Sequence, residues 1–105
     1  AMSLKDLKLK TNIVKRIHSE SKSYATELEY QQKRIDKFIE ENRDEYDIKK
    51  QKEVLEETLK MIPDCKNRLQ KAYQELQNLV TINNPSWEGT DELAKAKETL
   101  ETVKF

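Results

Sequence analysis

The sequence is short of the residues that interrupt helices and of those that cross-link chains. Its 105 residues include one glycine, two prolines and one cysteine. So few glycines and prolines exclude a β-protein built on many turns, and a single glycine excludes every glycine-rich phosphate-binding loop. One cysteine cannot form an internal disulfide, and such cysteine usage is typical of proteins in a reducing compartment. We therefore expect a helical protein that resides in the cytoplasm.

Long hydrophobic runs are also absent from the sequence. A membrane-spanning helix needs about 18 or more consecutive apolar residues, and no run approaches that length, so we expect no membrane partner. The 20 basic side chains balance the 20 acidic ones, and the two signs alternate along the chain, which argues against a nucleic-acid partner. Charged residues make up 38% and apolar residues 35% of the chain. This composition predicts a folded protein with a thin core.

The balanced charge is unevenly distributed along the chain. Residues 1–26 carry six basic and two acidic side chains, whereas residues 27–47 carry four basic and eight acidic ones. Lys5, Lys8 and Lys10 fall near the start of the first expected helix, where the helix dipole disfavours cations. Such departures from local rules sometimes mark binding surfaces. The favoured interpretation is nevertheless a solvated face with paired charges.

The first expected helix covers residues 3–42. Ser3 followed by Asp6 has the form of a capping box at its start. Apolar residues then recur at steps of three and four, which is the period of a helix packed in a coiled-coil-like seam. The positions of this seam are Leu7, Lys10, Val14, Ile17, Ser21, Tyr24, Leu28, Gln31, Ile35 and Phe38.

A second helix is expected over residues 47–80 after a short polar connection, in which Asp44 or Asp47 can cap it. Its seam repeats every seven residues, at Ile48, Leu55, Ile62, Leu69 and Leu76. Pro63 either begins a new helix or lies within a continuous, kinked one. The heptad phase passes through Pro63 without a slip, which favours the kinked helix.

A short third helix is expected over residues 90–104, with Thr90 as its N-cap. Short connections place consecutive helices antiparallel to one another. The sequence therefore predicts an all-α protein: an elongated, antiparallel, coiled-coil-like three-helix bundle that forms a single domain over residues 1–105. The third helix is too short to cover the whole hairpin of the first two.

Residues able to support catalysis or to bind a metal are scarce. His18 is the only histidine and Cys65 the only cysteine, so no His/Cys metal cluster can form. The spacing of the acidic residues matches no EF-hand. We therefore expect no enzymatic activity, no metal and no cofactor.

Two sequence blocks in the second helix resemble those of a known family. Residues 46–51 read Tyr-Asp-Ile-Lys-Lys-Gln, and residues 61–65 read Met-Ile-Pro-Asp-Cys. Together, at this separation, the blocks are similar to those of the tubulin-binding cofactor A family. The likeness is strongest over residues 46–76, fair over 7–40 and poor after Thr81.

The resemblance implies a function that periodicity cannot show. Members of this family act in the tubulin folding pathway, where they capture β-tubulin folding intermediates after release from the cytosolic chaperonin. The expected partner is thus β-tubulin, with an association with the cytoskeleton, and the protein is expected to be a monomer or a homodimer. Members use neither nucleotide nor metal.

Two other classes of protein fit the helical pattern. A structural three-helix module such as a spectrin repeat has similar length and heptads, but it usually carries a tryptophan in its first helix, whereas Trp87 lies in an expected loop. A subunit of a prefoldin-like holdase would have two long helical arms and no third packed helix.

The lengths of the expected helices suggest where a partner could bind. The third helix should shield the start of the first helix and the end of the second, leaving two helices exposed on their flanks around the first connection. An exposed apolar strip rimmed by charge is a common mark of a partner site. The candidate β-tubulin-binding residues are Tyr24, Leu28, Ile35, Phe38, Ile39, Tyr46, Lys49, Lys50 and Leu59.

Overall fold

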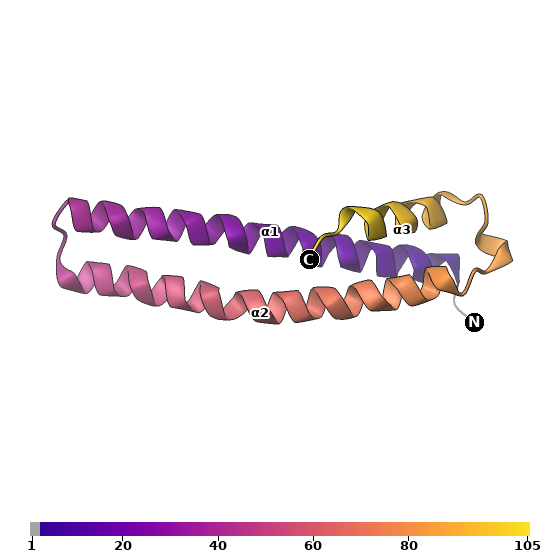
Figure 1. Ribbon diagram of the computed structural model, residues 1–105, viewed down its shortest axis with the longest axis horizontal. Coiled ribbons are helices and arrows are strands. Elements are labelled where there is room, and N and C mark those ends of the chain that lie inside the picture. The colour runs from indigo at the N-terminus through magenta and orange to yellow at the C-terminus, as the bar shows by residue number, and fades with distance from the viewer. Residues whose placement is uncertain (1–2) are drawn as a thin grey trace. The chain divides into compact units, whose positions relative to one another are not determined.

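The computed structural model describes residues 3–105 and is built from helices (Figure 1). Helix α1 spans Leu4–Glu40, α2 spans Glu45–Thr81 and α3 spans Asp91–Thr102, with a short 3-10 helix, η1, at Pro85–Trp87. No strand occurs within residues 3–105. The all-α class, the three helices and the short length of the third are therefore confirmed.

The chain divides into two compact units, and both boundaries fall inside helices. Unit 1 comprises Ala1–Ser19 and Lys66–Phe105, and unit 2 comprises Glu20–Cys65. Unit 1 therefore holds the start of α1, the end of α2 and all of α3. Unit 2 is a hairpin made of the rest of α1 and α2. That the chain forms a single domain stays a prediction.

Unit 1 contains most of the buried apolar residues. The third helix was expected to shield the start of the first helix and the end of the second, and five seam residues there are all buried: Leu7, Val14, Ile17, Leu69 and Leu76. Trp87 of η1 and Ala96 of α3 are buried as well. The hydroxyl of Tyr73 on α2 donates a hydrogen bond of 2.8 Å to the carbonyl of Leu100 on α3. α3 is thus tied to α2 by a polar contact as well as by apolar burial.

The helix ends follow from identifiable capping residues. The Thr90 hydroxyl accepts a hydrogen bond of 3.3 Å from the Leu93 N–H, which confirms Thr90 as the N-cap of α3. The Asp44 carboxylate accepts one of 3.2 Å from the Tyr46 N–H. A side chain that accepts from the first turn satisfies an amide that has no partner within the helix. Asp44 rather than Asp47 therefore starts α2.

The connection between α1 and α2 is a tight helix-terminating turn. Asn42 has a positive φ of 55°, a conformation that asparagine tolerates better than most residues. The Arg43 N–H donates to the Phe38 carbonyl and the Asn42 N–H donates to the Ile39 carbonyl, which is the hydrogen-bond pattern of a Schellman motif. This motif stops α1 at Glu40 and reverses the chain into α2.

Pro63 lies inside α2, which continues as one helix from Glu45 to Thr81. The alternative, in which Pro63 starts a separate helix, is therefore wrong. Proline has no N–H and so cannot bond to the carbonyl four residues earlier, which here belongs to Leu59. Pro63 is exposed, so the helix can adjust around the ring without disturbing buried side chains.

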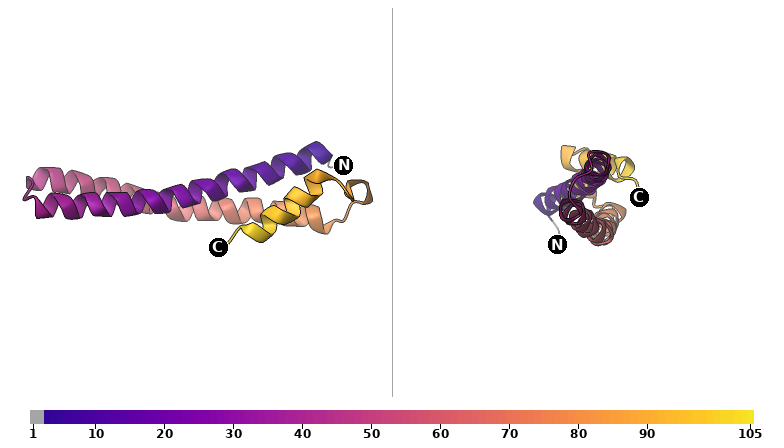
Figure 2. Two further views of the ribbon diagram at one scale, coloured as in Figure 1. Left: turned by 90° about the horizontal axis from the view of Figure 1, so that it is seen from above. Right: turned by 90° about the vertical axis from the view of Figure 1, so that its left-hand side faces the viewer.

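In unit 2 the two helical segments lie side by side and antiparallel in both directions of view (Figures 1 and 2). Its buried residues are Gln31, Ile35, Thr58 and Cys65. Half of these are polar residues with an amide or hydroxyl group. A two-helix hairpin buries only the facing sides of its helices, so the flanks of this seam remain open to solvent.

Candidate functional site

All nine residues of the predicted binding surface lie in unit 2, but they differ in exposure. Ile39, Tyr46 and Leu59 expose 52%, 62% and 45% of their surface. Lys49 and Lys50 are also exposed, while Tyr24, Leu28 and Phe38 are half-buried. Ile35 is only 3% exposed. Ile35 packs within the seam between the two helices, so it is not available for contact with a partner.

Two of the predicted residues line one groove along the hairpin, which we call the apolar groove. Its lining residues are Leu28, Glu29, Gln32, Leu55 and Leu59, and its volume is about 300 Å³. The three leucines come from the seam and its flank, and Glu29 and Gln32 supply a polar rim from α1. The groove can therefore accept an aliphatic side chain of a partner while its rim stays hydrated.

Five of the other seven predicted residues gather around the connection, at what we call the hairpin tip, residues 38–50. The guanidinium of Arg43 lies 4.4 Å from the centroid of the Phe38 ring. The Lys50 ammonium lies 5.6 Å from the centroid of the Tyr46 ring and 3.8 Å from a carboxylate oxygen of Glu53. These cation–ring contacts hold the aromatic faces next to positive charge.

The structure does not bring the nine residues into one groove. Leu28 and Leu59 share the apolar groove, Phe38, Ile39, Tyr46, Lys49 and Lys50 belong to the hairpin tip, and Tyr24 and Ile35 face the seam of the hairpin. Tyr24 is additionally held by a hydrogen bond of 3.3 Å from its hydroxyl to Glu20. A partner that uses the whole predicted surface would have to contact both the groove and the tip.

Seam-based reasoning missed several exposed side chains in unit 2. Tyr30, Val54 and Met61 expose 67%, 46% and 38% of their surface. They lie outside the heptad positions, so the seam pattern does not predict them. Val54 and Met61 are seven residues apart and therefore share a face of α2. Arg43 was also missed, because its stacking on Phe38 depends on the turn geometry.

Other classes of site find little support in the described residues. Within residues 3–105 no group of three or more His, Cys, Asp or Glu side chains is placed to hold a metal ion. No helix in that range has a stretch long and apolar enough to cross a membrane. Cys65 is buried, with 1% of its surface exposed.

Comparison with known proteins identifies the relatives of this chain. The family model described as "Tubulin binding cofactor A" matches residues 2–100. The human protein named "Tubulin-specific chaperone A" is 40% identical over 102 residues, which cover 97% of this chain and 94% of the human protein. Relatedness of this extent, over nearly the full length of both proteins, reflects a shared fold throughout the chain.

Solved structures agree with the sequence comparison. The structure of "human tubulin chaperone cofactor a" superposes with a TM-score of 0.79 at 38% identity and covers 97% of this chain and 98% of that one. The structure of tubulin folding cofactor A from Arabidopsis thaliana gives a TM-score of 0.82 at 33% identity, covering 93% and 92%. The chain belongs to the tubulin binding cofactor A family.

Proposed function

We propose that the protein is a tubulin-folding cochaperone that captures β-tubulin folding intermediates released from the cytosolic chaperonin. The observation that carries the proposal is the family match over residues 2–100, together with relatives named as tubulin-specific chaperones. This match favours a cochaperone over a spectrin-like module or a prefoldin-like subunit. The protein would act by binding alone, without catalysis or a cofactor, in the cytoplasm and in association with the cytoskeleton.

Unit 2 supplies surface chemistry that suits this role. A folding intermediate exposes apolar side chains that the finished protein buries, and the apolar groove and hairpin tip offer exposed apolar side chains within a charged surface. Full burial of an aliphatic side chain contributes about 1.5–3 kcal/mol. Because Leu59 is 45% exposed, covering its exposed part contributes about 1 kcal/mol, or about fivefold in affinity.

The charges around this surface suit a reversible complex. Lys49 and Lys50 lie on the first turns of α2 and are exposed, so they can meet acidic groups of β-tubulin at the rim of the contact. Exposed ion pairs add little affinity but speed association and orient the partner. The protein therefore holds the intermediate through modest apolar contacts and releases it without an energy source.

Partner selection is the direct test of this proposal. Radiolabelled β-tubulin released from chaperonin and purified αβ-tubulin heterodimer are each incubated with the protein and separated on a native gel. We expect a complex with released β-tubulin and none with the heterodimer, whose buried subunit interface hides apolar surface. Equal retention of both, or retention of neither, contradicts the proposal. The same gel, run with the protein at several concentrations, shows whether it binds as a monomer or a homodimer.

A further inference from the structure

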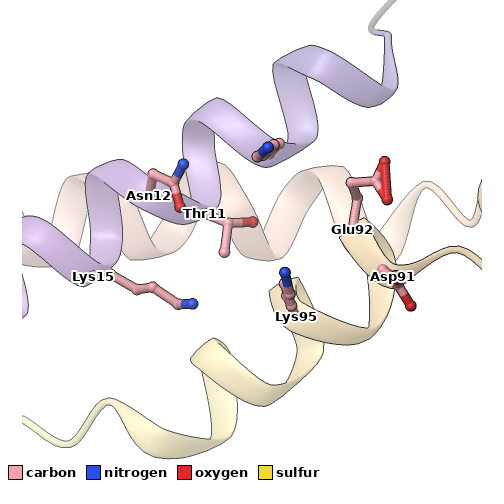
Figure 3. A pocket seen from close by; sticks show the side chains of 7 residues that line it. Thr11, Asn12, Lys15, Asp91, Glu92 and Lys95 are labelled. Carbon is pink, nitrogen blue, oxygen red and sulfur yellow. The ribbon is translucent and has the colours of Figure 1, made fainter.

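A second groove with a different chemistry lies in unit 1, between α1 and α3 (Figure 3). We call it the lysine groove; its lining residues are Lys8, Thr11, Asn12, Lys15, Asp91, Glu92 and Lys95. Its volume is about 310 Å³. No aromatic or large aliphatic side chain lines it. The lysine groove shares no residue with the candidate β-tubulin-binding surface, so the proposed function does not account for it.

Three lysines from two helices line this groove. Lys8 and Lys15 are seven residues apart on α1 and so lie on the same face of that helix, and Lys95 faces them from α3. Figure 3 shows the side chains of Lys15 and Lys95 directed into the space between the two helices, with the Asp91 carboxylate turned away from it. Three ammonium groups therefore converge on one groove.

These ammonium groups are not neutralised by the carboxylates nearby. Among the residues that the structure describes, Lys8, Lys15 and Lys95 form no ion pair, whereas Lys10 pairs with Glu75 and Lys50 with Glu53. Asp91 and Glu92 line the same groove yet remain unpaired with these lysines. Asp91 and Glu92 lie in the first turn of α3, where they favour the helix dipole instead.

The floor of the groove is polar. Thr11 is 2% exposed, and its hydroxyl donates a hydrogen bond of 2.9 Å to the Leu7 carbonyl. Asn12, next to it, is exposed, so its side-chain amide can donate to a ligand. The groove thus presents several donors and positive charges on a fixed scaffold.

From this geometry we infer that the lysine groove binds an acidic segment of a protein partner, in extended conformation, through carboxylates spaced along it. Lys8 and Lys15 are separated by about 10 Å along α1, at 1.5 Å per residue. Carboxylates two to four residues apart on an extended segment span about 7–13 Å, at 3.3 Å per residue. An acidic segment with carboxylates at this spacing reaches both lysines.

Nucleic acid fits the lysine groove less well than an acidic peptide. Single strands are bound by aromatic side chains on which bases stack, in addition to positive charge, and no aromatic residue lines this groove. The inference does not depend on the proposed function, because the site and its ligand are separate from it.

The test measures binding of a labelled oligoglutamate peptide of about ten residues, long enough to span the groove, by fluorescence anisotropy with the full chain. An oligoglutamine peptide of the same length is the neutral control. We expect binding of oligoglutamate only, weakening as salt rises from about 0.05 M to about 0.5 M because the charges are exposed. Lys15→Gln combined with Lys95→Gln should weaken binding about threefold to tenfold.

Matched variants distinguish binding by the lysines of this groove from binding by other lysines on the surface. Lys71→Gln combined with Lys104→Gln removes two exposed lysines of unit 1 outside the groove and should leave affinity almost unchanged. Asp91→Asn combined with Glu92→Gln should tighten binding about twofold, with helicity checked by circular dichroism. Equal losses from both lysine pairs, or binding of oligoglutamine as tight as that of oligoglutamate, would overturn the inference. Tighter binding of an oligouridine RNA through the same lysines would overturn it too.

Discussion

Gln31 and Gln51 carry buried side-chain oxygens that have no hydrogen-bond donor among the residues that the structure describes. Gln31 is 5% exposed, and its amide nitrogen donates a hydrogen bond of 3.1 Å to Glu27. Its oxygen Oε1 is the unpaired acceptor. A buried polar atom without a partner typically reduces stability by about 1–3 kcal/mol. The seam of unit 2 is therefore less stable than its heptad pattern suggests.

Replacing Gln31 by leucine should stabilise the protein. Gln31→Leu removes the unpaired oxygen and keeps a side chain of similar size in the seam, so we expect a gain of about 1 kcal/mol, or a Tm higher by about 4 °C. Thermal melting followed by circular dichroism measures the change. Gln70→Leu, at an exposed position of α2, is the control and should change Tm little. A lower Tm for Gln31→Leu would mean that the amide has a required partner.

Asp6 stabilises the start of α1 to an extent that depends on pH. The Ser3 backbone N–H donates a hydrogen bond of 2.9 Å to the Asp6 carboxylate, and the Ser3 hydroxyl lies 3.0 Å from the same oxygen. The Asp6 N–H donates in return to the Ser3 hydroxyl at 3.2 Å. These bonds, the backbone one first, lower the pKa of Asp6 below its ordinary value. The predicted capping box is confirmed, with aspartate in the position usually held by glutamate.

The pH dependence of this cap has a definite sign. Because the folded-state pKa is lowered, the carboxylate stabilises the helix start at pH values above about 4. This contribution is lost as the pH falls through the lowered pKa. Titration of the Asp6 side-chain carbon by NMR should give a midpoint below the ordinary aspartate value. In Ser3→Ala, which lacks the hydroxyl bond, the midpoint should rise; an unchanged midpoint would contradict the role of this bond.

At the scale of helices, Pro63 is the clearest departure from regular structure. α2 continues through Pro63, although a proline within a regular helix reduces stability by about 3 kcal/mol. The residue is exposed, so alanine fits there without a clash. We expect Pro63→Ala to leave Tm unchanged or to raise it. Leu76→Ala, a core truncation in the same helix, is the comparison and should lower stability by about 2–5 kcal/mol.

The outcome of Pro63→Ala also tests whether the proline shapes the fold. If Pro63→Ala lowers Tm as much as Leu76→Ala, then the backbone geometry around Pro63 is required for packing. That result would contradict the interpretation of Pro63 as a tolerated residue on the exposed side of α2. Far-ultraviolet circular dichroism should show equal or greater helix content in the alanine variant.

Helix positions and caps were predictable from the sequence because they depend on local spacing. The three-four steps at Leu7 and Val14, the Thr90 cap and the passage of the heptad phase through Pro63 are each local signals. Contacts across helices were not predictable in the same way. The stacking of Arg43 on Phe38 depends on the geometry of the turn after α1, and the burial of Ile35 depends on how the two helices of unit 2 pack.

The candidate site was only partly accessible to sequence reasoning for the same physical reason. Spacing placed Leu28 and Leu59 near the seam, and the structure adds that they line one groove with Leu55. Sequence spacing could not predict how exposed flank residues such as Val54 and Met61 are, because their exposure depends on the rotation of each helix about its axis. The lysine groove was signalled only by the excess of basic residues in the first helix.

At the scale of the whole molecule, the chain combines a well-buried core in unit 1 with a two-helix hairpin that keeps apolar groups exposed. Val14 and Leu76 are fully buried in unit 1, whereas Leu59, Ile39 and Tyr46 of unit 2 are each at least 45% exposed. A folded scaffold that keeps an apolar surface available is suited to capturing partly folded clients. We propose that β-tubulin binds on the side of unit 2 that carries the apolar groove.

Capture of released β-tubulin by two single variants and their controls tests this claim most directly. Leu59→Gln alters the apolar groove, and Val54→Gln alters a residue of equal exposure, 46% against 45%, that lies about 140° away around the same helix. Lys49→Glu alters the charged rim, with Lys71→Glu of unit 1 as its control. Circular dichroism verifies that every variant is folded.

On native gels with chaperonin-released β-tubulin, Leu59→Gln should weaken capture about fivefold. Lys49→Glu should weaken it about twofold to threefold, while Val54→Gln and Lys71→Glu bind as the unaltered protein does. Capture that is unchanged in both Leu59→Gln and Lys49→Glu, with helicity retained, would contradict the account and place the β-tubulin contact outside the groove side of unit 2.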